Sequence, residues 1–354
     1  MNPVRLAFIG CGGWARKKYI PYLLGRPDVT IVAAARLVYP AEADAFRQRV
    51  PAAHLFADEA EMLAVEKPDG VIVSLPPACV AATLRTVVAH GTPFMVDKPF
   101  TTSVAEAEEI VREATARGVA AGVCHQRRAY PAIAAARDLL DNGGRAQLRW
   151  ITASFFLHSY PAWLTSWRND PAYTGDAALR QGILLDAGYH LLDSILYLLD
   201  FELPHRVIGS AAYREARVET DVTAILEFAG ERRATLQVSR HFPATFELES
   251  LELLGDGWFA RSLERKGEGA DAASFQLFRE GEPSEQWGMA AGNAPVAPIA
   301  AFVAHLQGSA FPALWSARGA VPTLRVMDAL YRSMREGTPV VMVGNGHAGQ
   351  ATPR

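Results

Sequence analysis

The stretch that decides the fold is Leu6-Ala7-Phe8-Ile9-Gly10-Cys11-Gly12-Gly13-Trp14-Ala15, in which an apolar run leads into a glycine-rich turn. The apolar run predicts a short buried strand, and residues 15–24 predict a helix. Between them the chain has the form G-x-G-x-x-A, in which the first glycine makes a tight turn and the second lets the backbone approach a pyrophosphate. The small Ala15 permits close helix–strand packing, and the helix N-terminus offers unpaired N–H groups. The stretch predicts a dinucleotide site; an ordinary glycine turn is the alternative.

The rest of the first third alternates short apolar runs with amphipathic stretches. Such alternation is typical of βαβ units, in which helices cover both faces of a parallel sheet. We therefore predict a doubly wound α/β Rossmann domain that binds a dinucleotide over residues 1–124. Its further strands are expected at 30–35, 70–74, 93–96 and 119–123, and its further helices at 41–50, 59–65, 79–90 and 104–117.

Beyond residue 125 strands follow one another at hairpin spacing, which predicts an α+β substrate-binding domain over residues 125–343 with an open, mostly antiparallel sheet. Segment 264–295 is rich in Gly and Glu and is expected to be loop, apart from a candidate edge strand at 274–278. Residues 344–354 are expected to form a disordered tail. Strands are expected at 147–156, 206–212, 221–228, 234–240, 250–255 and 258–262, and helices at 131–140, 184–199, 299–306 and 322–336.

The composition excludes several classes of protein. A length of 354 residues, half of them hydrophobic, exceeds the usual single core of about 250–300 residues and favours two domains. With 35 basic and 38 acidic residues, the chain lacks the basic footprint of a nucleic-acid-binding protein. Cys11, Cys79 and Cys124 form no CxxC pair, so neither a disulfide framework nor a cysteine zinc site is expected. No apolar run of about 18 residues and no signal-peptide pattern occurs, so we expect a cytoplasmic protein without membrane contact.

The end of the second predicted strand bears on the choice of nicotinamide cofactor. An NAD site usually has an acidic residue there, about 20 residues beyond the glycine motif, that binds the ribose 2′-OH. This chain has Arg36 at that place and no acidic residue from 31 to 40. A carboxylate would repel a 2′-phosphate, whereas an arginine pairs with one. NADP(H) is therefore favoured over NAD(H), unless Arg36 is only a solvated strand end.

A lysine follows the strand at 93–96, in the sequence Asp97-Lys98-Pro99. Lys98 is therefore expected at the carboxyl edge of the parallel sheet, where open α/β folds bind ligands. At that place its ammonium group can hold a substrate oxygen and stabilise an alkoxide as it forms. An ordinary surface lysine is the alternative.

The apolar helix expected at 184–199 carries Asp186, His190 and Asp193 at a spacing of i, i+4 and i+7, which places them on one face. A histidine beside an acid is a common proton shuttle near neutral pH. Two alternatives are a core helix whose polar groups bind the backbone and a two-ligand metal site. No further cluster of ligands supports a metal, so none is expected.

Together these motifs resemble the Gfo/Idh/MocA family, named after glucose–fructose oxidoreductase, inositol dehydrogenase and rhizopine catabolism. The resemblance runs from the glycine motif to about residue 343 and rests on several ordered segments. They are Val71-Ile72-Val73-Ser74-Leu75-Pro76-Pro77 (a strand ending in T-P-N), Phe94-Met95-Val96-Asp97-Lys98-Pro99 (V-x-x-E-K-P), His125-Gln126-Arg127-Arg128-Ala129-Tyr130-Pro131 (the domain crossing), Trp167-Arg168 (W-R) and Gly182-Ile183-Leu184-Leu185-Asp186-Ala187-Gly188-Tyr189-His190 (G-x-L-x-D-x-G-x-H).

The resemblance implies hydride transfer between a nicotinamide and a carbinol carbon, usually of a sugar, polyol or derivative. It implies three catalytic residues: His190 exchanges the hydroxyl proton, while Lys98 and Asp186 position and polarise the same oxygen. It also implies a cis peptide before Pro99, and a homodimer or homotetramer formed through the open face of the second sheet.

The glycine motif and the resemblance together define the candidate binding residues. Three departures from the family pattern accompany them: Leu75-Pro76-Pro77 lacks the amide and hydroxyl of T-P-N, Arg180-Gln181-Gly182 replaces G-G-G, and Asp97 replaces Glu. The substrate is expected to contact Lys98, His125, Arg128, Asp186 and His190. The cofactor is expected to contact Gly10, Gly12, Gly13, Trp14, Ala15, Arg36, Leu75, Pro76, Lys98 and Arg168.

The function that the sequence favours is an NAD(P)-dependent oxidoreductase acting on the CH–OH group of a small sugar or polyol-like substrate, with NADP(H) as cofactor. One alternative is an NAD-dependent glycosidase that works by transient oxidation and elimination. Another is a dinucleotide sensor without catalytic activity. The identity of the sugar and the direction of hydride transfer are not encoded in any motif.

Overall fold

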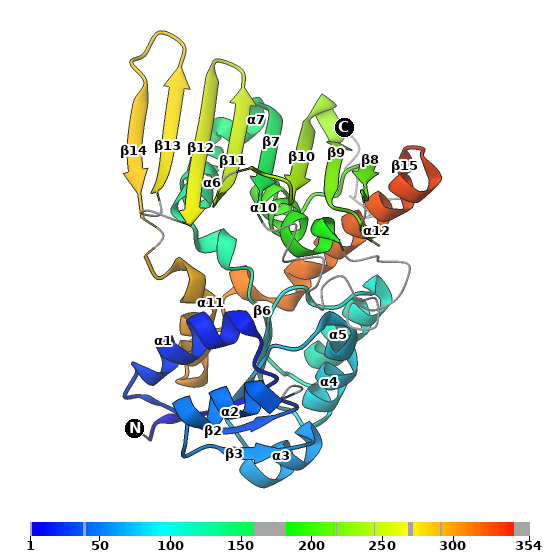
Figure 1. The fold of residues 1–354 in the computed structure, drawn as a ribbon. Coiled ribbons are helices and arrows are strands. Elements are labelled where there is room, and N and C mark those ends of the chain that lie inside the picture. The colour runs from blue at the N-terminus through cyan, green and yellow to red at the C-terminus, as the bar shows by residue number, and fades with distance from the viewer. Residues whose placement is uncertain are drawn as a thin grey trace, which may run out of the picture.

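A computed structural model describes residues 2–37, 40–158, 182–214, 216, 218–243, 245–267, 272–290 and 292–342. These residues form two bodies, each built around its own β-sheet (Figure 1). Within the described residues, none of the helices is both long enough and apolar enough to cross a bilayer. Residues 344–354, expected to be a disordered tail, and the Trp167-Arg168 motif lie outside the described part of the chain.

The first sheet is parallel throughout, with the strand order β3-β2-β1-β4-β5-β6. All residues of β4 and β5 are buried, because helices cover both faces of this sheet. The strand order reverses between β1 and β4, which is the switch point where open α/β sheets bind ligands. The predicted doubly wound sheet is confirmed. Its strands are β1 (Val4–Ile9), β2 (Val29–Ala35), β3 (His54–Phe56), β4 (Gly70–Val73), β5 (Phe94–Val96) and β6 (Ala121–Val123).

Two groups of helices pack on the two faces of the first sheet. On one face lie α3 (Glu59–Glu66), α4 (Pro77–Ala89) and α5 (Val104–Ala116), and on the other η1 (Ala15–Tyr19), α1 (Ile20–Leu24) and α2 (Pro40–Arg49). The second group is joined by α11 (Ala297–Leu306), which comes from near the end of the chain and lies beside α1 in Figure 1. Gly70 is needed for this contact, since a Cβ there would lie 2.7 Å from the Phe302 ring. The division of the chain near residue 125 stays a prediction, and α11 returns to the first sheet from beyond it.

The second sheet has nine strands in the order β14-β13-β12-β11-β7-β10-β9-β8-β15. Its pairs are antiparallel except for the central pair of β7 and β10, which run parallel. The predicted mostly antiparallel sheet is therefore confirmed. Its strands are β7 (Leu148–Phe156), β8 (Arg206–Ala212), β9 (Asp221–Glu227), β10 (Arg233–Ser239), β11 (Phe246–Gly255), β12 (Trp258–Gly267), β13 (Ala272–Arg279), β14 (Glu285–Met289) and β15 (Val340–Val341).

Helices pack on one face of the second sheet. The central one is formed by η5 (Leu184–Gly188) and α10 (Tyr189–Leu198), and α10 contacts α6 (Pro131–Leu139) and α12 (Val321–Glu336) on either side. Short helical segments complete the described chain: η2 (Gln126–Ala129), η3 (Leu140–Gly144), α7 (Arg145–Gln147), η6 (Ala229–Glu231), η7 (Ala294–Val296), η8 (Ala313–Trp315) and η9 (Ala317–Ala320).

The expectation of loop over 264–295 was wrong for much of that segment. β12 extends to Gly267, and β13 and β14 follow as a hairpin. Only alternate positions of β13 face the core: Phe275 and Leu277 are buried, whereas Phe278 and Arg279 are exposed. A half-exposed strand has a weak apolar signal, and the Gly- and Glu-rich segments on either side of β13 hid it. The three-residue β3 was also missed, because it is too short to show alternation.

Candidate active site

The glycine turn after β1 packs tightly against the end of β4. Gly10 has a φ of +73°, and a Cβ there would lie 2.4 Å from the carbonyl oxygen of Ser74. A Cβ on Gly12 would lie 2.9 Å from Ser74 Oγ, whereas a Cβ on Gly13 would meet no atom within 4 Å. Ala15 is fully buried under the turn. The turn thus brings backbone close to β4 and leaves open space at Gly13, an arrangement that fits a bound pyrophosphate.

The departure at Leu75-Pro76-Pro77 changes what this edge offers to a cofactor. The Leu75 side chain fills the space beside Gly10, where a Cβ would approach Leu75 Cδ2 to 2.6 Å. Pro76 precedes α4, which begins at Pro77, and neither proline has an N–H group. Pro76 can therefore contact a cofactor only through its ring and its carbonyl oxygen, whereas Leu75 keeps a backbone N–H as a possible donor.

Arg36 is held by two buried residues rather than by solvent. It follows β2 with a φ of +53°, and its Nη1 donates to Glu59 Oε1 at 3.1 Å and to Thr83 Oγ1 at 3.2 Å. Glu59 is 5% exposed and Thr83 is fully buried, so part of the arginine charge neutralises a buried carboxylate. The Arg36 side chain is nevertheless 32% exposed, so it is both paired and partly solvated.

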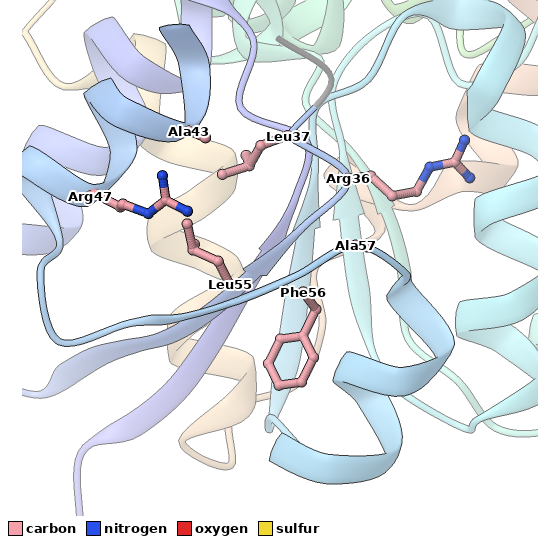
Figure 2. Close-up of a pocket in the computed structure, with 7 residues that line it drawn as sticks. All are labelled: Arg36, Leu37, Ala43, Arg47, Leu55, Phe56 and Ala57. Carbon is pink, nitrogen blue, oxygen red and sulfur yellow. The ribbon is translucent and has the colours of Figure 1, made fainter. Parts of the chain in front are cut away.

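A cavity of about 510 Å³ adjoins Arg36 at the end of β2. Arg47 from α2 is a second arginine among the lining residues, and it also pairs with Asp44 at 3.3 Å. Figure 2 shows the Arg36 side chain directed away from Leu37 and Arg47, which lie on the other side of the strand end. The cavity is lined by Arg36, Leu37, Ala43, Arg47, Leu55, Phe56 and Ala57.

Lys98 joins the two bodies of the molecule. The Lys98-Pro99 peptide is cis, as the family resemblance implied. Lys98 Nζ donates to the backbone oxygen of Asp186 at 2.6 Å and lies 3.4 Å from Asp186 Oδ1. Lys98 comes from the loop after β5 and Asp186 from η5, so residues 88 positions apart in sequence meet here. Their side chains are 17% and 31% exposed, so both remain reachable by a ligand.

The residue before Lys98 is anchored below the edge of the first sheet. Asp97 Oδ1 accepts a hydrogen bond from Tyr19 OH at 3.1 Å and from the Lys98 backbone N–H at 3.2 Å. Ser74 Oγ donates to Asp97 Oδ2 at 3.4 Å. Burial raises the pKa of Asp97, and the positive charge of Lys98 opposes this effect. These contacts fix the backbone from which Lys98 extends.

His190 lies one helical turn beyond Asp186, at the start of α10, and is half-buried. Burial lowers the pKa of His190 well below its usual range, and the positive charges of Lys98, Arg127 and Lys266 lower it further. The imidazole is therefore neutral near pH 7 and can accept a proton. Lys98 and Asp186 are thus in contact, and His190 follows Asp186 one helical turn along; the catalytic role of the three residues stays a prediction.

Arg240 is a residue of this site that the sequence reasoning missed. It follows β10, its side chain is almost fully buried, and its Nη2 donates to Asp186 Oδ2 at 2.6 Å. A signal was present, because the alternation along β10 places Arg240 on the same face as the buried Leu236 and Val238. An arginine at an inward-facing strand position needs a partner charge.

His125 and Arg128 lie in a buried network under the central helix. Arg128 donates from Nε and Nη2 to Asp193 at 3.0 and 2.7 Å, and from Nη1 to the carbonyl oxygen of Leu314 at 2.6 Å. His125 Nε2 lies 2.9 Å from Tyr189 OH, and burial lowers the pKa of His125 to about 3. The contacts of these side chains join the crossing segment to α10. Their expected contact with substrate stays a prediction, as does that of Arg168, which lies outside the described residues.

Two family models match the chain. One, described as an oxidoreductase family with an NAD-binding Rossmann fold, matches residues 4–125, and the other, a GFO/IDH/MocA C-terminal domain, matches residues 133–257. Together they span well over half of the chain. The protein belongs to the Gfo/Idh/MocA family.

Curated relatives of this family member are enzymes of more than one kind. Trans-1,2-dihydrobenzene-1,2-diol dehydrogenase of Bos taurus is 28% identical over 197 residues, which is 53% of this chain and 55% of the relative. The dTDP-3,4-didehydro-2,6-dideoxy-alpha-D-glucose 3-reductase of Streptomyces antibioticus is 28% identical over 222 residues, or 60% of this chain and 62% of the relative. The match thus spans little more than half the length of these relatives.

A solved structure of the family extends the likeness over nearly the whole chain. The 3-ketoreductase from Actinomadura kijaniata, solved in complex with NADP and TDP-benzene, superposes with a TM-score of 0.78. The match covers 94% of this chain and 98% of that one, at 22% sequence identity. At this level of identity the comparison establishes the fold of both bodies and no more.

One departure from the Gfo/Idh/MocA pattern, Arg180-Gln181-Gly182, keeps the glycine that the packing requires. A Cβ on Gly182 would lie 2.1 Å from the backbone oxygen of Glu219. The Glu219 carboxylate accepts hydrogen bonds from Leu184 N–H at 3.1 Å and from Tyr331 OH at 2.8 Å. Glu219 therefore satisfies the N-terminus of the segment that carries Asp186, and only a glycine lets the two backbones approach.

Proposed function

We propose that this family member is an NAD(P)-dependent oxidoreductase that transfers a hydride between a nicotinamide and the carbinol or carbonyl carbon of a sugar, polyol or sugar derivative. The observation that carries the proposal is the contact of Lys98 with Asp186 across the two bodies, one helical turn from His190. The contact lies where β5 ends, at the edge of the sheet that binds ligands in open α/β folds. The reductase and dehydrogenase names of the relatives support the same class of reaction.

The residues present fit the cofactor and divide the work of the reaction. A bound nicotinamide supplies or accepts the hydride. The turn from Gly10 to Gly13 and the helix N-terminus that follows hold the pyrophosphate. The Lys98 ammonium group stabilises negative charge on the substrate oxygen as it develops. The neutral His190 takes the hydroxyl proton during oxidation and returns it during reduction. Asp186 holds Lys98 in place.

We infer that NADP(H) is the preferred cofactor. The cavity at the end of β2 has two arginines in its lining, Arg36 and Arg47, and no carboxylate among its lining residues in the described chain. Positive charge at this place suits a ribose 2′-phosphate. Because Arg36 also forms an ion pair with Glu59, a 2′-phosphate bound here would compete with that carboxylate for the guanidinium.

The test is a panel of ketoses, ketosugars, polyols and glycosides, run with NADPH, NADH and their oxidised forms and followed by nicotinamide absorbance. On the substrate found, Lys98→Ala and His190→Ala should each lower kcat by about 100- to 10,000-fold. The dissociation constant for the cofactor should change little. His90→Ala, at an exposed histidine on the first body, is the control and should keep wild-type turnover.

Three outcomes would contradict the proposal. Wild-type turnover in both the Lys98→Ala and His190→Ala variants would show that neither residue takes part in the reaction. Cleavage of a glycoside without net nicotinamide turnover would indicate a glycosidase. Tight cofactor binding with no turnover across the panel would indicate a sensor.

A further inference from the structure

The buried arginine at the end of β10 continues the core-facing side of that strand. Ala234, Leu236 and Val238 are at most 2% exposed, and Arg240 follows them at the next alternate position with 3% exposure. Its backbone N–H donates to the carbonyl oxygen of Thr220 at 3.1 Å, which links the residue to the segment just before the neighbouring strand β9. A guanidinium this deep in a protein costs free energy unless a charged partner compensates it.

The compensating partner is a carboxylate of the proposed active site. Arg240 Nη2 lies 2.6 Å from Asp186 Oδ2, while the other oxygen of the same carboxylate lies 3.4 Å from Lys98 Nζ. Asp186 thus stands between two cations that come from different bodies of the molecule. The arginine is almost fully buried, whereas the aspartate and the lysine are 31% and 17% exposed. A ligand in the site can therefore reach Asp186 and Lys98 more easily than Arg240.

We propose that Arg240 is a positioning residue for the reaction: it fixes the Asp186 carboxylate so that this carboxylate holds Lys98 toward the substrate oxygen. This inference rests on the proposed function. A guanidinium is a planar, always charged donor that sits in a rigid orientation once buried, so it selects one orientation of a carboxylate. Without it, Asp186 could turn about its side-chain bonds. Lys98 would keep its hydrogen bond to the Asp186 backbone oxygen at 2.6 Å but would lose the fixed carboxylate beside its ammonium group. Small errors in the position of a catalytic group are costly.

Because Asp186 is surrounded by charged groups, removing Arg240 should change how kcat/KM depends on pH. Lys98 and Arg240 face Asp186 with positive charge, and His190 follows it on the same helix. Glu247 on β11 adds negative charge: burial raises its pKa, the charges of Lys266 and Arg127 oppose this, and Asp186 adds to the increase. Removing Arg240 leaves Lys98 as the cation that contacts Asp186 among the described residues. A carboxylate that loses a neighbouring cation takes up a proton at higher pH.

The experiment compares Arg240→Met and Arg240→Lys with wild type on the substrate found by the panel. Arg240→Met should lower kcat by about 10- to 100-fold, the loss of one charge-assisted hydrogen bond, with a much smaller change in KM. The acid limb of its kcat/KM profile should move to higher pH. Arg240→Lys should restore the acid limb and only part of kcat, because it keeps the charge and loses the planar group.

The matched control is Arg232→Met, at the other end of the same strand. Arg232 Nη2 pairs with Glu202 at 2.6 Å, the same length as the Arg240 pair, and lies far from Asp186 along β10. It should keep the kcat and the pH profile of wild type. A double-mutant cycle with Asp186→Asn adds a second control: once Asp186 cannot carry charge, replacing Arg240 should have almost no further effect on kcat/KM.

A crystal structure of the Arg240→Met variant provides a readout that needs no activity. The Asp186 carboxylate should have rotated about its side-chain bonds from its wild-type orientation, so that the 3.4 Å approach of Oδ1 to Lys98 Nζ is no longer kept. An unchanged carboxylate would overturn the inference, as would additive effects in the cycle or a rise in KM at constant kcat, which would place Arg240 in contact with substrate. If wild type fails on the whole panel, the proposed function is wrong, and the crystal structure still decides whether Arg240 positions Asp186.

Discussion

Arg36 has two competing partners for its positive charge, the buried carboxylate of Glu59 and the phosphate of a bound cofactor. In the structure Arg36 Nη1 lies 3.1 Å from Glu59 Oε1, so the guanidinium is paired with the carboxylate. A 2′-phosphate carries more negative charge than one carboxylate and offers more acceptor oxygens, so it can compete for the same guanidinium. The strength of the cofactor preference therefore depends on Glu59 as well as on Arg36.

Two substitutions in this pair should shift cofactor preference in opposite directions. Arg36→Asp should weaken NADPH binding relative to NADH by about 10- to 100-fold, because a carboxylate repels the 2′-phosphate. Glu59→Gln should favour NADPH by a few-fold, because it removes the charge that competes for Arg36. Dissociation constants from cofactor fluorescence measure both effects, with the exposed Glu61→Gln on the same helix as control. A wild-type preference for NADH would contradict the proposal.

The first backbone N–H groups of the segment formed by η5 and α10 are satisfied by a residue that lies outside this segment. Glu219 accepts from Leu184 N–H, and its backbone oxygen accepts from Ile183 N–H at 2.9 Å. An N-cap side chain satisfies these groups in other helices, and here Glu219, from the loop before β9, does so. The position of Asp186 and His190 on the helix face is thus a local property, while the anchoring of the helix is a tertiary one.

Burial raises the pKa of Glu219 to about 7, above its ordinary value of 4.5. Between these pH values the folded protein keeps a proton that the unfolded chain releases, so this group makes wild type less stable as pH rises through the window. Glu219→Gln keeps an acceptor for both hydrogen bonds and cannot ionise. The free energy of unfolding of wild type minus that of the variant should therefore fall by about 3 kcal/mol from pH 4.5 to 7.5.

Urea denaturation at several pH values measures this difference, and the comparison with a variant is essential. Burial lowers the pKa of His125 to about 3, so the unfolded chain binds a proton there that the folded protein does not, and this group alone makes stability rise with pH up to about 6.5. The effect of His125 is common to both proteins and cancels. The exposed Glu280→Gln serves as control. A difference that does not change with pH would contradict the prediction.

At the scale of the whole molecule, the face of the second sheet opposite the helices carries apolar side chains. Leu254 pairs with Phe259 and Phe259 with Phe278 across three strands, and the two phenylalanine rings lie 5.9 Å apart. Leu254 and Leu263 are each 49% exposed. Exposed apolar patches of this kind are typical of protein–protein contacts. They support a homo-oligomer formed through this face.

If the protein assembles through this face, Leu263→Glu should shift the assembly to a smaller species, because it places a charge among the exposed apolar side chains. Sedimentation velocity at micromolar concentration measures the change. Leu24→Glu, at a leucine of similar exposure on the first body, is the control and should leave the assembly intact. A monomeric wild-type protein would contradict this prediction.

The sequence by itself determined the features that depend on local pattern. Short continuous apolar runs between amphipathic stretches predicted the parallel sheet, because its central strands are buried on both faces. Periods of two and 3.6 predicted most strands of the second sheet and the helix that carries Asp186 and His190, because burial of one face imposes that period on neighbouring residues. The glycine turn was predictable because the pattern G-x-G-x-x-A between a strand and a helix lies within one short stretch, whereas the approach of Ser74 to Gly10 and Gly12 is tertiary.

Only the tertiary structure decided which charges are partners. Arg36 lies 23 residues from Glu59, Arg240 lies 54 residues from Asp186, and Arg128 lies 65 residues from Asp193. The packing of α11 on the first sheet could not be predicted either, because the apolar residues of a helix do not specify which sheet they will pack against. A charge or an apolar face is visible in sequence, whereas its partner depends on which elements the fold places side by side, and the role of each residue follows from that partner.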